Sequence, residues 1–307
     1  MTIDLTETTT GAIHDALTQA RHSMGGPALG MVLTLIIVTD ESAQYDAIRA
    51  ASQASREHPC RVLGVIMRNP SGRSRLDAEI RLGETGPGET VLLRMHGPLG
   101  EHADSVIVPL ILPDTPVVTW WPGPAPEIPS ADPLGALAQR RVTDAAASGK
   151  PRQMLTALAS GYRPGDTDLS WTRATPWRSL LAATLDQPYA TLQRGVVSAE
   201  QHNPSADLIT TWLSGRLGIP VLREVSGGPG ITEVRFVTAD GDITLSRPDG
   251  RTATMARPGQ GERRVSLLRR DTAELLTEEL RRLDPDDVYA EALGRFAKNP
   301  VNEEAAV

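Results

Sequence analysis

Tryptophan and arginine gather in one short segment, Asp168-Leu-Ser-Trp171-Thr-Arg173-Ala-Thr-Pro-Trp177-Arg178. Both residue types are enriched among the side chains that carry most of the binding energy at protein–protein interfaces. An arginine can also stack on an indole, which would make the same segment an interdomain latch. The segment therefore predicts either a partner-binding surface that contains Trp171, Arg173, Trp177 and Arg178 or a latch, and the sequence does not choose between them.

A second tryptophan pair, Trp120-Trp121, ends a predicted strand just before Pro122-Gly-Pro-Ala-Pro126. Adjacent strand residues point to opposite faces, so one indole can belong to the core while the other is less constrained. Ligands of open α/β sheets bind at the carboxyl ends of strands. We therefore add Trp121 to the candidate partner-binding residues, with packing in the core as the alternative.

The sequence contains few residues that could support nucleophilic or metal-assisted catalysis. His58 and Cys60 stand close enough for an imidazole to activate a thiolate, but a helix-terminal histidine beside a small buried cysteine fits the pattern better. The remaining histidines are not at metal-ligand spacing, and a single cysteine excludes an intrachain disulfide. We predict no catalytic residue and no metal site.

Phosphate-binding signatures are also missing. The chain has no P-loop, no Gly-x-Ser-x-Gly elbow and no His-Glu-x-x-His helix, and none of its Gly-x-Gly pairs is followed by the third glycine of a dinucleotide fingerprint. We therefore predict no cofactor. The alternative is a sugar-phosphate-binding α/β enzyme that uses the loop Asn69-Pro-Ser-Gly-Arg73-Ser-Arg75, whose hydroxyls and guanidinium groups suit an anion.

Composition narrows the class of protein. The 307 residues are 40% hydrophobic and 22% charged, which permits a buried core, and the formal net charge of −7 argues against nucleic-acid binding. The longest apolar run, residues 31–38, is too short to cross a membrane, and the N-terminus lacks the pattern of a secretory signal. These features predict a soluble cytoplasmic protein that binds no nucleic acid, membrane or metal.

The hydrophobic pattern predicts elements that would hold these residues in place. In the first half, a helix with Ile13, Leu17 and Ala20 at helical spacing and helices at 43–57 and 133–139 accompany strands at 30–39, 61–67, 78–82, 90–96 and 115–121. The strands at 30–39 and 61–67 flank the helix at 43–57 in a β-α-β unit with parallel pairing, and the strands at 78–82 and 90–96 form an antiparallel pair around a turn at 83–88. In the second half, helices at 176–185, 205–217, 271–283 and 286–297 accompany a strand at 190–199. A meander of strands between residues 221 and 268 completes this half. We expect Arg140-Arg141 and Glu278-Glu279 to be solvated.

The densest cluster of turn residues, 161–168, predicts a domain boundary. We place an N-terminal Rossmann-like mixed α/β domain at residues 1–165. A C-terminal α+β domain with an antiparallel meander would occupy residues 166–307.

Several segments, in order along the chain, resemble the bacterial glucose-6-phosphate dehydrogenase assembly protein family, OpcA. They are Gly30-Met-Val-Leu-Thr-Leu-Ile-Ile-Val38, Ala54-Ser-Arg-Glu-His-Pro-Cys-Arg61, Asp114-Thr-Pro-Val-Val-Thr-Trp-Trp-Pro122, Asp132-Pro-Leu-Gly135 and the segment from Asp168 to Arg178. The resemblance covers about two-thirds of the chain.

The resemblance implies a non-enzymatic allosteric activator that binds glucose-6-phosphate dehydrogenase and favours its active oligomer. Such a protein would direct sugar phosphate into the oxidative pentose phosphate pathway and support NADPH supply. Some relatives respond to redox state through cysteines, and Cys60 alone cannot form the internal disulfide that this control would need.

Overall fold

A computed structural model describes residues 1–23, 30–69, 71–83, 88–299, 301 and 303–305. The chain divides into two compact units. The first contains Met1–Asp144, Arg163–Thr167 and Asp271–Pro285, and the second contains Ala145–Tyr162, Asp168–Arg270 and Asp286–Val307. The predicted cut between residues 165 and 166 stays a prediction. Residues 25–27, where Gly-Gly-Pro follows the first predicted helix, and residues 84–87 of the predicted turn at 83–88 lie outside the described residues.

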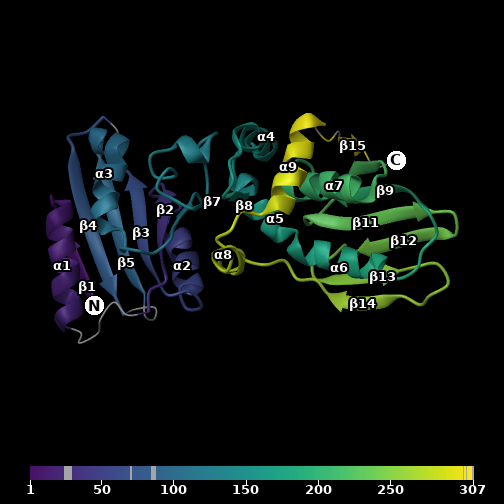
Figure 1. The fold of residues 1–307 in the computed structure, drawn as a ribbon, viewed down its shortest axis with the longest axis horizontal. Helices are drawn as coiled ribbons and strands as arrows, with labels where there is room; N and C mark the ends of the chain where they lie inside the picture. Colours follow the sequence, from purple (N-terminus) through teal and green to yellow (C-terminus); the bar gives the residue numbers. More distant parts are fainter. Residues whose placement is uncertain (24–29, 70, 84–87, 300, 302, 306–307) are drawn as a thin grey trace. The chain divides into compact units, whose positions relative to one another are not determined.

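The first unit is built on an eight-stranded sheet with the order β1-β4-β5-β3-β2-β6-β7-β8 (Figure 1). The strands are β1 (Thr2–Leu5), β2 (Leu33–Thr39), β3 (Cys60–Met67), β4 (Arg75–Leu82), β5 (Glu89–His96), β6 (Val117–Trp120), β7 (Arg140–Thr143) and β8 (Asp166–Asp168). From β5 to β7 the strands run parallel, and β1, β4 and β5 add antiparallel pairs at one edge. The predicted Rossmann-like α/β fold is therefore confirmed for this unit.

The central strands are buried on both faces, as the unbroken apolar runs predict. Ile36 of β2 lies opposite Leu63 of β3, and neither is exposed. Chain order reverses beside β2, because β3 lies on one side of it and β6 on the other. Such a switch point is where doubly wound sheets bind dinucleotides.

Four α-helices, α1 (Thr10–Ser23), α2 (Gln44–Ala54), α3 (Ala103–Ile107) and α8 (Thr272–Leu280), belong to the first unit. Helix α2 buries an alanine-rich face and packs against α8, which reaches this unit from far along the sequence. Asp271 caps α8 in a reciprocal capping box with Glu274. The predicted helix at 133–139 is wrong: those residues form turns, in which the Asp132 carboxylate accepts hydrogen bonds from the amides of Leu134 and Gly135.

The charged pairs expected in solvent are also corrected by the structure. Arg140 is 3% exposed and Glu279 is 7% exposed, and they form an ion pair at 2.6 Å. Arg141 is buried on Asp166. Each guanidinium gains a carboxylate partner, which makes the burial of the charge possible.

The second unit contains a seven-stranded sheet with the order β14-β13-β12-β11-β9-β10-β15. Its strands are β9 (Leu192–Ala199), β10 (Val221–Val225), β11 (Ile231–Thr238), β12 (Gly241–Ser246), β13 (Thr252–Ala256), β14 (Arg263–Ser266) and β15 (Glu303–Ala305). Strands β11 to β14 form the predicted antiparallel meander. Strand β10 is not part of it, because helix α7 carries the chain from β9 to a parallel position beside β9.

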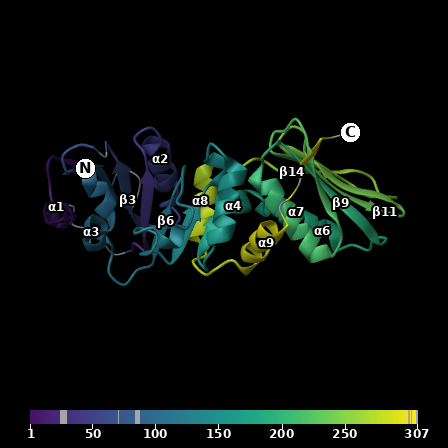
Figure 2. The same cartoon turned by 90° about the horizontal axis from the view of Figure 1, so that it is seen from above.

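Helices α4 (Pro151–Gly161), α5 (Leu169–Arg173), α6 (Thr175–Leu185), α7 (Pro204–Leu217) and α9 (Asp287–Lys298) complete this unit. Helices α6 and α7 lie against one face of the sheet (Figure 2), and their apolar side chains pack on it. Asn203 caps α7, because its side chain accepts a hydrogen bond from the Ala206 amide at 3.0 Å, and Ser205, the first residue of the predicted helix, lies inside the helix. Gly218 ends α7 in the left-handed conformation, which glycine adopts without strain.

Among the described residues, no helix is long and apolar enough to cross a membrane.

Candidate partner-binding site

Trp171 is the centre of an aromatic cluster in the second unit. It lies in α5, whose first turn is capped by Asp168 through the Ser170 amide. Its indole is 1% exposed and donates a hydrogen bond from Nε1 to Asp286 Oδ2 at 2.9 Å. The rings of Trp212 and Tyr289 lie 6.4 Å and 6.1 Å away, between centroids. These contacts make the indole a packing element of the unit.

Arg178 stacks on this tryptophan. Its Cζ atom lies 3.8 Å from the centroid of the Trp171 ring, and Nη2 donates to Thr175 Oγ1 at 2.9 Å. A guanidinium at this distance is attracted by the negative face of the indole. The arginine–indole stacking that the sequence left open is therefore present, and both side chains belong to the second unit.

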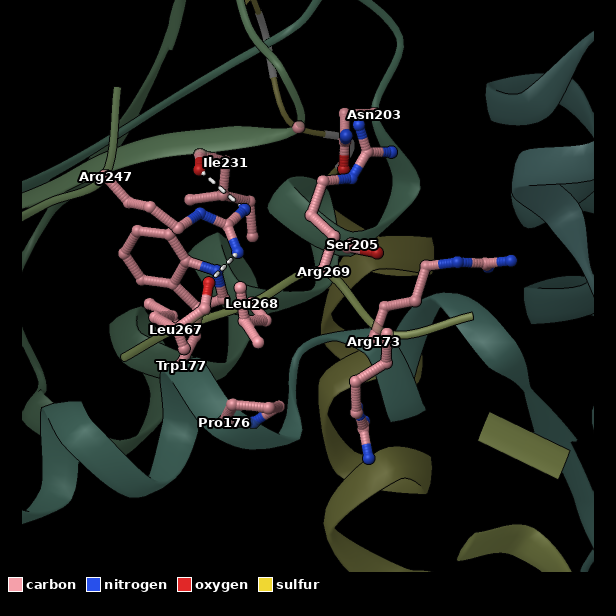
Figure 3. A pocket seen from close by; sticks show the side chains of 12 residues that line it. Arg173, Pro176, Trp177, Asn203, Ser205, Ile231, Arg247, Leu267, Leu268 and Arg269 are labelled. Atoms are coloured by element: carbon pink, nitrogen blue, oxygen red, sulfur yellow. Dashed lines mark hydrogen bonds between the residues drawn. The ribbon is translucent and has the colours of Figure 1, made fainter. Parts of the chain in front are cut away.

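Trp177 lies on the buried face of α6 and is 2% exposed. The guanidinium carbon of Arg247 lies 5.0 Å from its ring centroid. Trp177, Arg173 and Arg247 line one cavity, with Arg269 as a further lining residue (Figure 3). Arg173 lines the cavity and is half-buried.

Trp121 belongs to the first unit and is 2% exposed. Its backbone amide donates to Val142 O at 2.9 Å, which prolongs the pairing of β6 with β7. The turn that contains Gly135 passes so close that a Cβ there would lie 3.1 Å from the indole. Trp120 is also fully buried, so neither indole of the pair is the exposed one that strand alternation allowed.

Four of the five predicted residues, Trp171, Arg173, Trp177 and Arg178, therefore lie in one part of the second unit, and Trp121 lies in the first. Their role in partner binding stays a prediction. Sequence reasoning missed Arg247, which is 5% exposed although it precedes a Pro-Asp-Gly turn. Turn residues of this kind are typical of the surface, and no local pattern indicates a buried arginine.

The switch point of the first sheet is not built to receive a dinucleotide phosphate. The turn between β2 and α2 is Asp40-Glu-Ser-Ala43, without glycine. Asp40 Oδ1 accepts hydrogen bonds from the Ser42 hydroxyl at 2.7 Å, the Ser42 amide at 2.8 Å and the Ala43 amide at 2.9 Å. The Ser42 hydroxyl, followed by the Ala43 amide, holds the pKa of this carboxyl below its ordinary value. The chain's own anion occupies the amides that a phosphate would use.

The loop considered for a sugar phosphate has carboxylates close to both of its arginines. Arg75 pairs with Asp77 at 2.9 Å, and Arg73 lies 4.0 Å from Glu7. Residue 70 of this loop lies outside the described residues. An incoming phosphate would have to compete with these carboxylates for both guanidinium groups.

Cys60 is fully buried in β3, and burial raises the pKa of its thiol to about 12. A thiol with that pKa stays protonated at neutral pH, so it is a poor nucleophile. Within the described part of the chain, no three His, Cys, Asp or Glu side chains come together in a way that could hold a metal ion.

Comparisons with known proteins agree with the resemblance seen in the sequence. A family profile for the "Glucose-6-phosphate dehydrogenase subunit N-terminal domain" matches residues 51–160, and one for the "C-terminal domain" matches residues 164–293. The "Putative OxPP cycle protein OpcA" of Synechocystis sp. is 28% identical over 159 residues. That match covers 48% of this chain and 33% of the Synechocystis protein.

Among solved structures, the 3-ketoreductase KijD10 of Actinomadura kijaniata, in complex with NADP and TDP-benzene, has a TM-score of 0.50 and 10% identity. The alignment covers 90% of this chain and 100% of the ketoreductase. This likeness concerns the fold alone. The two profiles together span most of the chain, which belongs to the OpcA family of glucose-6-phosphate dehydrogenase assembly proteins.

Proposed function

We propose that this protein binds glucose-6-phosphate dehydrogenase in the cytoplasm, favours its active oligomer and activates it allosterically, without catalysing a reaction itself. It would thereby support the oxidative pentose phosphate pathway and NADPH supply. The observation that carries the proposal is that both family domains match this chain. In the same chain, the Asp40 carboxylate accepts the backbone amide hydrogen bonds of the switch-point turn after β2. A Rossmann-type sheet without a free phosphate site suits a scaffold better than a dehydrogenase.

Activation by such a partner is a population shift. A protein that binds the active oligomer more tightly than the inactive form stabilises it by the difference in binding free energy and by nothing else. A tenfold preference corresponds to about 1.4 kcal/mol. The activator therefore needs a modest contact surface that distinguishes the two forms of the dehydrogenase, and no reactive group.

The predicted contact residues divide into two kinds by their exposure. Trp121, Trp171 and Trp177 are at most 2% exposed, so they would act by holding their surroundings in shape. Arg173 and Arg178 are half-buried and present charged groups that can reach a partner. We propose that these two guanidinium groups contact the dehydrogenase, with Arg178 oriented by its stacking on Trp171.

The test is titration of this protein into its cognate dehydrogenase, with mass measurement and initial rates recorded on the same samples. We expect a complex, more of the active oligomer and a higher rate, and no turnover of phosphorylated sugars by this protein alone. Unchanged dehydrogenase rates at a saturating dose would refute the proposal.

The contact residues are tested with Arg173→Ala, Trp177→Ala and Arg178→Ala. Arg216→Ala is the matched control, because Arg216 is an exposed arginine on α7 outside the segment. We expect the first three changes to weaken activation and the control to leave it intact. Normal activation by correctly folded variants would remove the altered residues from the contact, and a Trp177→Ala protein that only unfolds would assign Trp177 to packing.

A further inference from the structure

The cavity beside Trp177 is lined by arginines and by no acidic side chain. Arg173, Arg247, Arg269 and Arg270 come from three separate segments of the second unit, and no aspartate or glutamate is among the described lining residues. The cavity has a volume of about 80 Å³ and opens to solvent. Figure 3 shows side chains that line it. In a chain with a net charge of −7, such a concentration of positive charge is a local property of this site.

Arg247 is the buried member of the group, at 5% exposure. Its Nη1 and Nη2 atoms donate to Leu267 O at 3.0 Å and Ile231 O at 3.1 Å, as drawn in Figure 3. Nε is buried and has no hydrogen-bond partner among the described residues. Carbonyl oxygens fix the orientation of the guanidinium without neutralising it, because they carry no net charge. Burying a cation in this way is costly unless an anion accompanies it.

The charge of Arg247 is disfavoured by its surroundings. Burial first and the neighbouring charge of Arg269 second lower the pKa of Arg247 to about 10, and the attraction of Asp249 only partly opposes them. Arg269 is exposed, and in the part of the chain that the structure describes it makes no hydrogen bond or ion pair. An anion between these two guanidinium groups would remove their repulsion and supply the missing acceptor for Nε.

The positive end of α7 adds to this field. Asn203, which caps the helix, and Ser205 in its first turn both line the cavity. The helix is 14 residues long, so its N-terminus carries the partial positive charge of a full macrodipole. Arginine forks and a helix N-terminus are the two structures that recur where proteins bind phosphate.

We propose that this cavity binds a phosphate group, either the free ion or the head of a small phosphate monoester, with Arg247 and Arg269 as its main ligands. A phosphate supplies nearly two negative charges and several acceptor oxygens, which matches two guanidinium groups and a helix end better than a single carboxylate does. The small volume admits the phosphate group and leaves the rest of an ester in the opening to solvent. Arg173 lines this cavity and is also a proposed dehydrogenase contact, but phosphate binding is measured on this chain alone, so either proposal can fail without the other.

The test is isothermal titration of the full chain with inorganic phosphate, glycerol 3-phosphate and glycerol, at constant ionic strength. We expect phosphate and its ester to bind and glycerol not to bind. An ester that binds more tightly than the ion would identify a phosphorylated metabolite as the source, and equal affinity would identify the free ion. Absence of binding by both phosphorylated probes would overturn the proposal.

Two arginine variants locate the site. Arg269→Gln removes an exposed guanidinium that no fold contact requires, and we expect it to weaken phosphate binding at least tenfold. The matched control is Arg264→Gln, an exposed arginine on β14 that does not line the cavity. Phosphate should also raise the melting temperature of the wild type more than that of Arg269→Gln. Equal weakening by the two changes would show unspecific attraction and would also overturn the site.

Discussion

The stacking of Arg178 on Trp171 gives a measurable coupling free energy. The indole is 1% exposed and the guanidinium is half-buried, at 3.8 Å from the ring centroid. Cation–π pairs contribute about 0.5–1 kcal/mol at exposed sites and about 2 kcal/mol when desolvated. The intermediate burial of this pair places its coupling near 1 kcal/mol, which is a factor of about five in the folding equilibrium.

A double-mutant cycle with Trp171→Leu, Arg178→Met and the double variant isolates this term, because other contacts of each residue cancel. Methionine keeps the apolar stem of Arg178 and removes its charge. The free energies of unfolding come from urea titrations followed by circular dichroism. Trp171→Leu alone should cost several kcal/mol, since it also loses the hydrogen bond to Asp286.

A coupling below about 0.3 kcal/mol would refute the reasoning, because it lies within the additivity expected of independent sites. The same four proteins then test the proposed function. Arg178→Met should weaken dehydrogenase activation by more than its small loss of stability explains. A full coupling with unchanged activation would make Arg178 a packing residue of the second unit and remove it from the contact surface.

Three further predictions concern the first unit. Glu89→Gln should lower the free energy of unfolding by about 3–5 kcal/mol, because it removes the carboxylate that lies 3.0 Å from the buried Arg61 guanidinium. Glu41→Gln, in an exposed ion pair, should lower it by less than about 1 kcal/mol. Urea titration measures both values. Cys60, with a thiol pKa of about 12, should resist thiol reagents at pH 8 in the native protein and react once urea unfolds it; rapid native labelling would contradict its burial. Asp40→Ala should lose about 1 kcal/mol near neutral pH. The folded pKa of Asp40 lies below its ordinary 3.8, so the stability difference between wild type and variant should be full above pH 4 and should vanish as the pH falls through the folded pKa. A stability difference that grows on acidification would contradict the direction of this pKa shift.

The sequence predicts the elements well wherever hydrophobic period and turn residues agree. The strand at 61–67 and the helix face formed by Ile13, Leu17 and Ala20 are present because local patterning and tertiary burial favour the same structure. The helix expected at 133–139 is absent because the Asp132 carboxylate binds the amides of a tight turn. Strand β10 was expected in the meander because neighbouring strands usually pair, but α7 intervenes and makes its pairing parallel.

The candidate site is predictable only in part, because burial of charge depends on residues far apart in the chain. The Trp and Arg types between Trp171 and Arg178 point to the cluster, and their stacking is local. Arg140 and Glu279 are 139 positions apart, and nothing near either indicates that they neutralise each other in the interior. The burial of Arg247 cannot be predicted locally for the same reason, because the carbonyl oxygens that accept its hydrogen bonds belong to Ile231 and Leu267.

The position of helix α8 in the sequence also affects the order in which the units are completed during synthesis and the sites at which the chain can be truncated. It belongs to the first unit and packs on α2, yet residues 272–280 follow all the strands of the second-unit meander in the sequence. A ribosome therefore synthesises most of the second unit before the first receives its last helix. A fragment that stops at residue 165 would leave α2 without the helix that packs on it, so separating the units requires a circular permutation or a linker in place of a simple truncation.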